Sequence, residues 1–243
     1  MTTNKSFVII VPSFNNAAFC RRNLASILSQ DYASYRVIYI DDASTDDTAR
    51  LVSEELAASP QGHRVKFIRN ATRVGAVANT DRAVRTCSPQ EVIVLVDGDD
   101  QLAHERVLSR LNVIYRDPAV WLTYGQHTYY PHGGYGFCAQ VPNEIVGSSA
   151  FRDYRFVSSH LRTFYATLWQ RIEIRDLQSE GRFYDTGGDI AFMMAMLEMA
   201  GTHSRFIPEV LYLYNRANPI NDDKVDRARQ RASEFQIRDR DRY

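Results

Sequence analysis

The chain has 243 residues, of which 44% are hydrophobic and 24% are charged, and this balance excludes wholesale disorder. Its 29 lysines and arginines equal its 29 aspartates and glutamates, so the formal net charge is zero. A nucleic acid or an anionic membrane is therefore not expected as the main partner, because such partners select a basic surplus.

The cysteines and the lengths of the apolar runs indicate the compartment. Cys20, Cys87 and Cys138 are far apart and form no CxxC pair, so we expect neither a disulfide framework nor a zinc knuckle. This use of cysteine is typical of a protein in the reducing cytosol. The N-terminal apolar run, 7–11, is too short for a signal peptide. The longest apolar run, 190–197, is far shorter than the roughly 18 residues that span a bilayer. These features predict a cytoplasmic protein without a transmembrane segment, and they leave peripheral membrane association open.

The first half of the chain alternates between strand and helix patterns. The continuous apolar run 7–11 predicts a strand buried on both faces, and further strands are predicted at 36–40, 65–68, 92–96 and 119–125, of which 92–96 is the most apolar. The intervening segments predict helices, first one with Cys20, Leu24, Ile27 and Leu28 on one stripe, then 44–58, 75–86 and 104–115. This alternation predicts an α/β fold with a parallel, doubly wound sheet.

The second half is less regular. Residues 129–150 are rich in glycine, proline and aromatic residues and are typical of a loop. After them we expect helices at 159–170 and 188–200 and a short strand pair around 205–214. The charged tail, 222–243, is predicted to form a surface helix.

Acidic residues follow two of the predicted strands. Asp41 and Asp42 come directly after the second strand, and the segment DGDD (97–100) follows the fourth. Ligands of open α/β sheets bind at the carboxyl ends of the strands, so these carboxylates should share one edge. Carboxylates placed together repel one another unless a cation or hydrogen-bond donors compensate them. Alone, DGDD is also compatible with a solvated turn that caps the next helix, but the pair at the neighbouring strand end favours a Mg²⁺ or Mn²⁺ site.

Four segments in order carry a resemblance to a known family: FVIIVPSFNN, YIDDASTDDTA, RNATRVGAVANTDRA and VLVDGDDQL. Together they resemble the family 2 glycosyltransferases with the GT-A fold, closely over about 6–105 and loosely to about 220. The resemblance implies a Rossmann-like, mostly parallel twisted sheet flanked by helices, with a smaller acceptor-side C-terminal portion. We therefore expect a donor-binding subdomain at 1–126, an acceptor and catalytic-base portion at 127–221, and a charged tail at 222–243.

The resemblance also implies a set of residues that contact the nucleotide sugar: Pro12, Phe14, Asn15, Asp41, Asp42, Arg73, Asp97, Gly98 and Asp99. Asp41 and Asp42 would contact the nucleobase, in a pocket lined by Pro12 and Phe14. Asp97 would face the ribose and Asp99 the metal, with Asp97 as a further metal ligand. Asp100 would support them or cap a helix, and Arg73, otherwise a surface arginine, would lie near the diphosphate.

The catalytic base is expected at the start of the helix predicted for 188–200. Asp189 is compatible with a helix cap, and in the resembling family an acidic pair at such a helix start supplies the base. The position usually taken by Glu is Gly188 here, so the match is partial, and Asp185 is the second candidate. An inverting transfer needs one carboxylate to accept the proton of the acceptor hydroxyl. The bound metal, Mn²⁺ or Mg²⁺, would stabilise the leaving diphosphate.

The predicted function is thus an inverting, metal-dependent hexosyltransferase that moves a sugar from a nucleotide sugar, UDP-linked in preference, to a hydroxyl of a growing glycan. Two alternatives stay open: a nucleotidyltransferase acting on sugar phosphates, and a non-catalytic relative that binds nucleotide sugars. The sequence leaves undetermined the sugar, the acceptor, the linkage, the oligomeric state and the roles of His160, His203 and the 215–224 loop.

Overall fold

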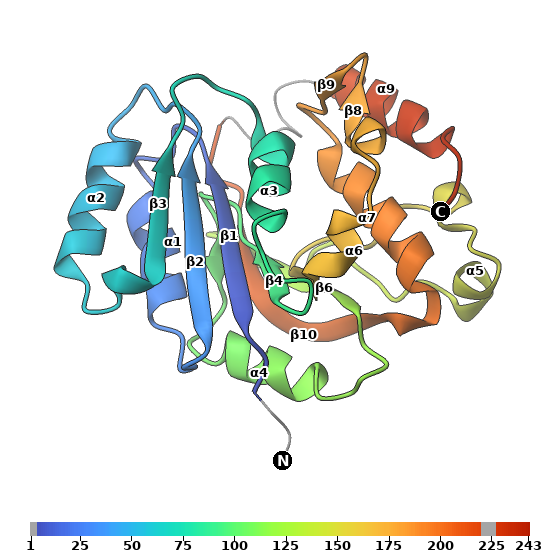
Figure 1. Cartoon of the computed structure of the whole chain (residues 1–243), viewed down its shortest axis with the longest axis horizontal. Coiled ribbons are helices and arrows are strands. Elements are labelled where there is room, and N and C mark those ends of the chain that lie inside the picture. The colour runs from blue at the N-terminus through green and yellow to red at the C-terminus, as the bar shows by residue number, and fades with distance from the viewer. Residues whose placement is uncertain (1–3, 220–226) are drawn as a thin grey trace.

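The computed structural model describes residues 4–219 and 227–243 and has the predicted α/β architecture (Figure 1). Four parallel strands build its first half: β1 (Phe7–Ser13), β2 (Tyr35–Asp41), β3 (Val65–Arg69) and β4 (Val92–Leu95). They lie in the order β3-β2-β1-β4 within one eight-stranded sheet. The carboxyl ends of β1, β2 and β4 therefore meet at one edge.

Residues 7–11 of β1 are all apolar because helices cover both faces of the strand. Val8 and Ile10 pack with α3 (Ala76–Val84) on one face, whereas Phe7, Ile9 and Val11 pack with α1 (Cys20–Leu28), α2 (Thr48–Ala58) and α4 (Val107–Ile114) on the other. A strand buried on both faces needs a continuous apolar run rather than an alternating one. The predicted helices are confirmed here, with ends that differ by a few residues.

The second half of the sheet corrects the prediction of a helix over 159–170. Residues Arg162–Tyr165 form β7, which lies between β4 and β6 (Leu122–Tyr130) and is antiparallel to both. Only Ala166–Gln170 is helical, as α6. The fifth predicted strand, 119–125, is likewise shifted, because β6 continues to Tyr130. Strand pairing over long sequence distances decides these bounds, and the local pattern does not contain it.

The prediction of a strand pair around 205–214 is wrong, because Ser204–Asn215 forms one long strand, β10. It runs parallel to β6 and antiparallel to the short β5 (Gln101–Leu102). Its register shifts between Ile207 and Val210 and again between Val210 and Tyr212. Pro208, which has no backbone N–H to donate, lies in the first shift, so β10 bends there without ending. The bent strand carries its C-terminal end to the edge where β4 ends.

The remaining elements cover the right-hand part of the sheet in Figure 1. They are the helices α5 (Asn143–Gly147), α7 (Gly188–Ala200) and α9 (Arg227–Arg238), the hairpin β8 (Gln178–Ser179) and β9 (Arg182–Phe183), and 3-10 turns at Phe151–Asp153, Ile174–Leu177 and Gly201–His203. A further 3-10 turn, Gly62–Arg64, directly precedes β3. The predicted helix at 188–200 is confirmed as α7. Of the predicted tail helix, 227–238 is helical, and 222–226 lies outside the described residues.

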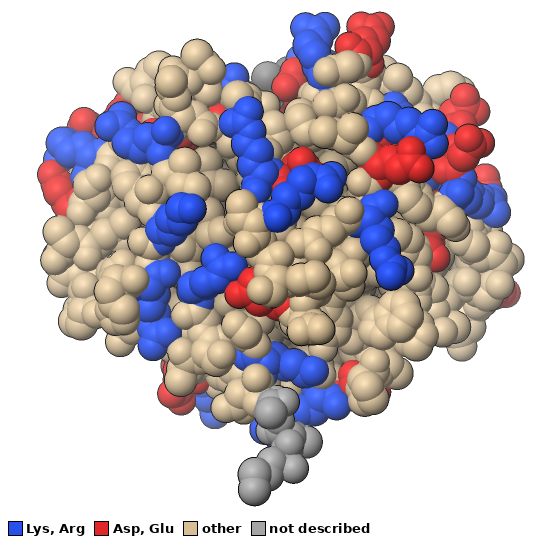
Figure 2. Space-filling model, viewed as in Figure 1, with Lys and Arg blue, Asp and Glu red and all other residues tan. Residues whose placement is uncertain are grey.

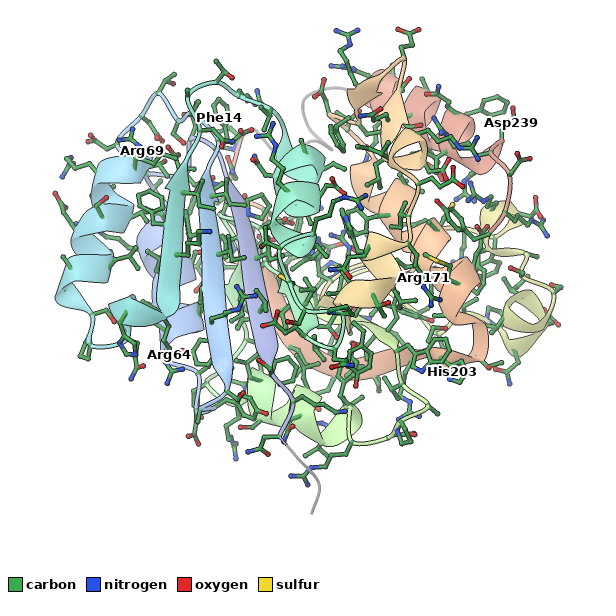
Figure 3. All side chains as sticks on the ribbon, viewed as in Figure 1. Phe14, Arg64, Arg69, Arg171, His203 and Asp239 are labelled. Atoms are coloured by element: carbon green, nitrogen blue, oxygen red, sulfur yellow. The ribbon has the colours of Figure 1, made fainter. Side chains whose placement is uncertain are left out.

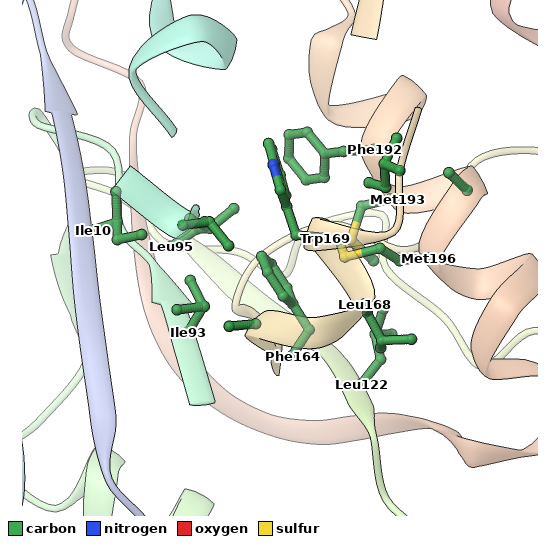
Figure 4. Close-up of a cluster of buried hydrophobic side chains, with 14 of the residues drawn as sticks. Ile10, Ile93, Leu95, Leu122, Phe164, Leu168, Trp169, Phe192, Met193 and Met196 are labelled. Atoms are coloured by element: carbon green, nitrogen blue, oxygen red, sulfur yellow. The ribbon is translucent and has the colours of Figure 1, made fainter. Parts of the chain in front are cut away.

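Helix α7 is buried on nearly all sides, which explains its low polarity. Met193 and Met196 pack with Phe164, Trp169 and Phe192 in the core between α7 and the sheet (Figure 4). Flexible thioethers fill irregular gaps between such rings. The methionines of this helix thus hold α7, and the residues at its start, against the sheet. Within the described parts of the chain, every helix is too short or too polar to cross a bilayer.

Candidate active site

A hollow of about 310 Å³ lies where β1 and β4 end and α7 begins. Seven of the ten predicted donor and base residues line it: Pro12, Phe14, Arg73, Asp97, Gly98, Asp99 and Asp189. Asp100, His160, Arg162, Asp185 and Asn218 line it as well. Figure 3 shows Phe14 and Arg69 at the end of the sheet where these strands finish, and Arg64 and His203 at the opposite end. His203 stacks on Trp121 with ring centroids 3.8 Å apart and is remote from the hollow.

The DGDD turn is held against β1 by the absence of a side chain at Gly98. A Cβ atom there would lie 2.5 Å from Ser13 Oγ and 2.7 Å from Asn16 Nδ2. Only glycine allows the turn to approach the end of β1 this closely. Gly98 therefore brings Asp97 and Asp99 beside the residues that follow β1.

Asp100 is a buried anchor that ties the turn to β10. Tyr212 Oη donates a hydrogen bond to Asp100 Oδ2 at 2.7 Å, and the Asn215 N–H donates to Oδ1 at 2.6 Å. The Asp97 N–H donates to the same Tyr212 oxygen at 3.1 Å. Burial, together with the charges of Asp99 and Asp97, raises the pKa of Asp100 well above its usual value. Helix α4 begins only at Val107, so Asp100 supports the turn rather than capping a helix.

Asp97, Asp100 and His160 form a group that could hold a metal ion, with ligand atoms within 4.8 Å of one another. His160 Nε2 lies 3.9 Å from Asp97 Oδ2, and its ring stacks on Tyr212 with centroids 4.5 Å apart. Burial, with Arg162 and His127 nearby, lowers the pKa of His160 well below its usual value, so its imidazole is neutral. Carboxylate oxygens suit Mg²⁺ and Mn²⁺, so this donor set fits the predicted metals.

The predicted metal ligand Asp99 is not in that group, although it lines the same hollow. Asn218 Nδ2 donates to Asp99 Oδ2 at 2.7 Å and lies 3.4 Å from Asn16 Oδ1. Asn218 belongs to the 215–224 loop, of which 220–224 lies outside the described residues. The described part of this loop therefore connects the end of β10 with the acidic turn.

The two aspartates after β2 have different surroundings, and neither lines the hollow. Asp41 is fully buried, and within the described chain its carboxylate accepts no hydrogen bond, while Arg69 Nε lies 3.6 Å away. Asp42 accepts hydrogen bonds from the Val74 and Gly75 N–H groups at 3.0 and 2.8 Å. Burial alone would raise the pKa of Asp42, but its hydrogen bonds outweigh burial and lower it. Asp42 thus shapes the loop that leads into α3.

The loop that Asp42 shapes presents Arg73 at the mouth of the hollow. The guanidinium carbon of Arg73 lies 4.1 Å from the centre of the Phe14 ring, a cation–π contact. Asn15, the residue after Phe14, is turned away from the hollow. Its Oδ1 accepts a hydrogen bond from the Thr45 N–H at 2.9 Å, so it joins the loops after β1 and β2.

Asp189 lies in the first turn of α7 and faces the hollow. Arg162 Nη2 donates to Asp189 Oδ2 at 2.8 Å, and the Arg162 side chain is only 6% exposed. A Cβ atom at Gly188 would lie 2.2 Å from Val77 Cγ2 on α3, so Glu does not fit at this position. The other candidate base, Asp185, is largely exposed and pairs with Arg229 at 2.8 Å.

Sequence reasoning missed Arg162, although it is the partner of the predicted base. The pairing of β7 with β4 sets Arg162 opposite Leu95, directly beside the end of β4. The segment was interpreted as a helix, and a lone arginine in a helix gives no signal of a site. The antiparallel insertion of β7 was needed to find it.

The comparisons with known proteins identify the class of this fold and site. The sequence profile described as glycosyl transferase family 2 matches residues 8–185, so the chain belongs to this family. Asp189 lies just beyond the matched range.

Two named relatives are similar over most of the chain. It is 29% identical to the chondroitin synthase of Escherichia coli over 166 residues, which are 68% of this chain and 23% of that protein. It is 23% identical to the glycosyltransferase GlyG of Streptococcus pneumoniae over 223 residues, which are 86% of this chain and 70% of that protein. The matched segments cover only part of the curated relatives' own length, namely 54%, 23% and 34% of three of them.

Solved structures confirm the GT-A glycosyltransferase fold. The structure of S. aureus TarS with UDP-GlcNAc is similar with a TM-score of 0.65 and 16% identity, over 91% of this chain and 61% of that one. The mannosyltransferase PcManGT of Pyrobaculum calidifontis, in complex with GDP-Man and Mn²⁺, gives a TM-score of 0.67 at 21% identity, over 100% of this chain and 67% of that one.

Proposed function

We propose that this family 2 glycosyltransferase moves a sugar from a nucleoside-diphosphate sugar, UDP-linked in preference, to a hydroxyl acceptor with inversion at the anomeric carbon. The observation that carries the proposal is that the DGDD turn and Asp189 face one hollow, although they come from opposite halves of the chain. The similar structures are complexes with UDP, UDP-GlcNAc and GDP-Man, which supports a nucleotide-sugar donor.

The donor would lie along the strand ends. Pro12 and Phe14 would flank the nucleobase, and Asp41 on the adjacent strand, at the position paired with Ser13, would accept a hydrogen bond from it. A buried carboxylate without donors is costly, so a nucleobase N–H at this point would be favourable. Arg73 would add positive charge beside the diphosphate, and Asp97 would face the ribose. Asn15 and Asp42 would act indirectly, by shaping the loops around the nucleotide.

A divalent metal at Asp97 and Asp99, with Asp100 and His160 beside them, would supply Lewis-acid stabilisation of the departing diphosphate. The residues themselves provide the rest of the chemistry. The acceptor oxygen attacks the anomeric carbon, the bond from that carbon to the diphosphate oxygen breaks, and Asp189 takes the hydroxyl proton. Arg162 fixes one carboxylate oxygen of Asp189, so that the other can be presented to the acceptor. Residues 1–126 would thus bind the donor and 127–221 the acceptor.

The test is donor turnover. Purified protein with Mn²⁺ or Mg²⁺ is offered UDP-, GDP- and dTDP-linked sugars, and release of the nucleoside diphosphate is measured. Asp189→Asn is expected to lower transfer about 10²- to 10⁴-fold, the usual contribution of a general base, while donor affinity stays unchanged. Asp99→Asn is expected to abolish metal-dependent donor binding.

Matched variants assign the effects. Asp239→Asn changes an exposed aspartate remote from the hollow (Figure 3) and should leave turnover unchanged. Asp185→Asn separates the two candidate bases: if it abolishes transfer while Asp189→Asn does not, the base is Asp185. If the protein binds donors but transfers none with any acceptor, it is a non-catalytic relative.

A further inference from the structure

A second hollow, of about 420 Å³, adjoins the proposed active site on the side where α7 begins. Its walls come from α7, from the segment after the 3-10 turn Phe151–Asp153, from α9 and from the loop after β6. Ile190, the residue after Asp189, lines it, and Gln230 lines both hollows. The two hollows therefore meet at the start of α7, where Asp189 lines the first and Ile190 lines the second.

The walls of this hollow are held in place by two arginines. Arg238 of α9 donates to Glu234 at 2.6 Å and to the carbonyl oxygens of Arg152 and Tyr154 at 2.6 and 2.7 Å. Arg152 in turn forms a buried ion pair with Glu198 of α7 at 2.6 Å. α9, α7 and the segment between them are thus connected, so the hollow exists before any ligand binds, which lowers the entropic cost of binding.

The charge in the second hollow is unbalanced. Its lining contains three arginines and one glutamate, and the charge of Glu234 is taken up by Arg238. The other two arginines, Arg155 and Arg231, are exposed, and among the described residues neither has an ion-pair or hydrogen-bond partner. Elsewhere the visible surface carries both signs of charge interspersed (Figure 2). Two guanidinium groups in one hollow that have no partner among the described residues favour a carboxylate or a phosphate.

Two aromatic rings lie between these charges. Phe137 is 56% exposed although it lines the hollow, and Phe156 is partly buried against the core. Binding hollows typically combine such apolar surface with a few polar groups that fix orientation. An exposed phenyl ring suits the apolar face of a pyranose, and the two arginines suit an anionic substituent beside it.

We propose that this second hollow binds the acceptor and that the acceptor is an anionic saccharide, with a carboxylate or phosphate next to the sugar that receives the transferred residue. Arg155 and Arg231 bind the anionic group, Phe137 packs on the ring, and the reacting hydroxyl points past Gln230 toward Asp189. This inference rests on the proposed function, and it adds the chemical class of the acceptor.

The test is a titration of the whole protein with Mn²⁺ and UDP at saturation, so that only the acceptor side is open. Three probes share one ring and one aglycone: phenyl β-D-glucoside, phenyl β-D-glucuronide and phenyl β-D-glucoside 6-phosphate. At least one charged probe should bind about three- to tenfold more tightly than the neutral one, the range expected for one or two exposed ion pairs. Whichever charged probe binds more tightly identifies carboxylate or phosphate as the natural group.

The variants make the experiment specific. Arg155→Gln/Arg231→Gln should remove the preference for the charged probe, with the melting temperature confirming that the variant is folded. Arg171→Gln removes an exposed arginine outside the hollow (Figure 3) and should keep the preference. Equal affinity for charged and neutral probes, no measurable binding of either charged probe, or a preference that survives in the double variant overturns the inference. The proposed function fails on a different result, namely no binding of UDP to the unaltered protein with any metal.

Discussion

Gly98 is the position where one added methyl group should disturb the proposed donor site most. Its Cβ would lie 2.5 Å from Ser13 Oγ and 2.6 Å from Ser13 Cβ, whereas ordinary contacts begin at 3.4 Å. Ser13 cannot turn aside without loss, because its Oγ accepts hydrogen bonds from Tyr39 and Asn16, both at 3.1 Å. In Gly98→Ala the turn must therefore move by the difference, 0.9 Å, away from β1.

This displacement sets the expected losses of stability and of turnover in Gly98→Ala. Overpacking a well-packed site costs about 1–3 kcal/mol in the free energy of unfolding. A shift of about 1 Å in groups that position a substrate costs on the order of 10²-fold in turnover. Urea unfolding, calorimetric titration with UDP and Mn²⁺, and nucleotide release measure the three quantities separately. Gly147→Ala is the matched control, because no described atom lies within 4 Å of its added Cβ and its φ is not positive.

If Gly98→Ala keeps the UDP affinity and turnover of the unaltered protein, the close contact of the turn with β1 does not control the donor site. A second variant tests the cause. Ser13→Gly/Gly98→Ala removes two of the three closest contacts and leaves the one to Asn16, so it should recover part of the lost donor affinity. If the double variant is as impaired as Gly98→Ala alone, the contact with Ser13 is not the origin of the defect.

Two further predictions concern buried charge. Arg152→Leu leaves Glu198 buried without its cation and should cost about 3–5 kcal/mol in urea unfolding. Arg205→Gln, which breaks the exposed ion pair with Asp117, should cost about 1 kcal/mol or less of the free energy of unfolding. Similar losses of stability in the two variants would contradict the difference expected between a buried and an exposed pair. Burial, with Arg162 nearby, lowers the pKa of His127 to about 4. Since the unfolded imidazole titrates near 6.5, the folded state binds fewer protons between pH 6.5 and 4 and loses up to about 3 kcal/mol of stability across that window. His127→Asn should flatten this acid-side slope, and an unchanged slope would assign the sensitivity to other groups.

The parts of the fold that could be predicted are those in which local pattern and final environment agree. The runs at 7–11 and 92–96 are continuous because both faces of β1 and β4 are buried, and the pattern alone contains this. The prediction of a helix over 159–170 was wrong because β7 forms by pairing with β4 and β6, which are distant from it in sequence. The sequence predicts a short strand pair around 205–214, whereas the structure has the single strand β10, in which the sheet accommodates Pro208 as a register shift.

The residues of the candidate site likewise divide into those that the sequence pattern could predict and those that depend on long-range strand pairing. The rule that ligands bind at strand ends brought Phe14, Asp97 and Asp99 to one hollow. The rule gives the edge and not the direction of each side chain, so it did not distinguish Asp42, whose oxygens are occupied by the loop before α3. His160 and Arg162 were beyond its reach, because an antiparallel strand brings them to the edge from the second half of the chain.

The distribution of charge in the first hollow limits how a nucleotide sugar could enter it. Asp97 and Asp99 form one wall with Asp100 behind them, and the lining offers Arg73 at the mouth and Arg162 beside Asp189 as cations. Arg162 is committed to Asp189 at 2.8 Å, so it compensates the proposed base rather than the acidic wall. A diphosphate brought alone against this wall would meet like charge in a partly buried setting, where repulsion is weakly screened. Under the proposed function, a divalent cation held beside Asp97 and Asp99 would reduce this repulsion and so favour binding of the diphosphate.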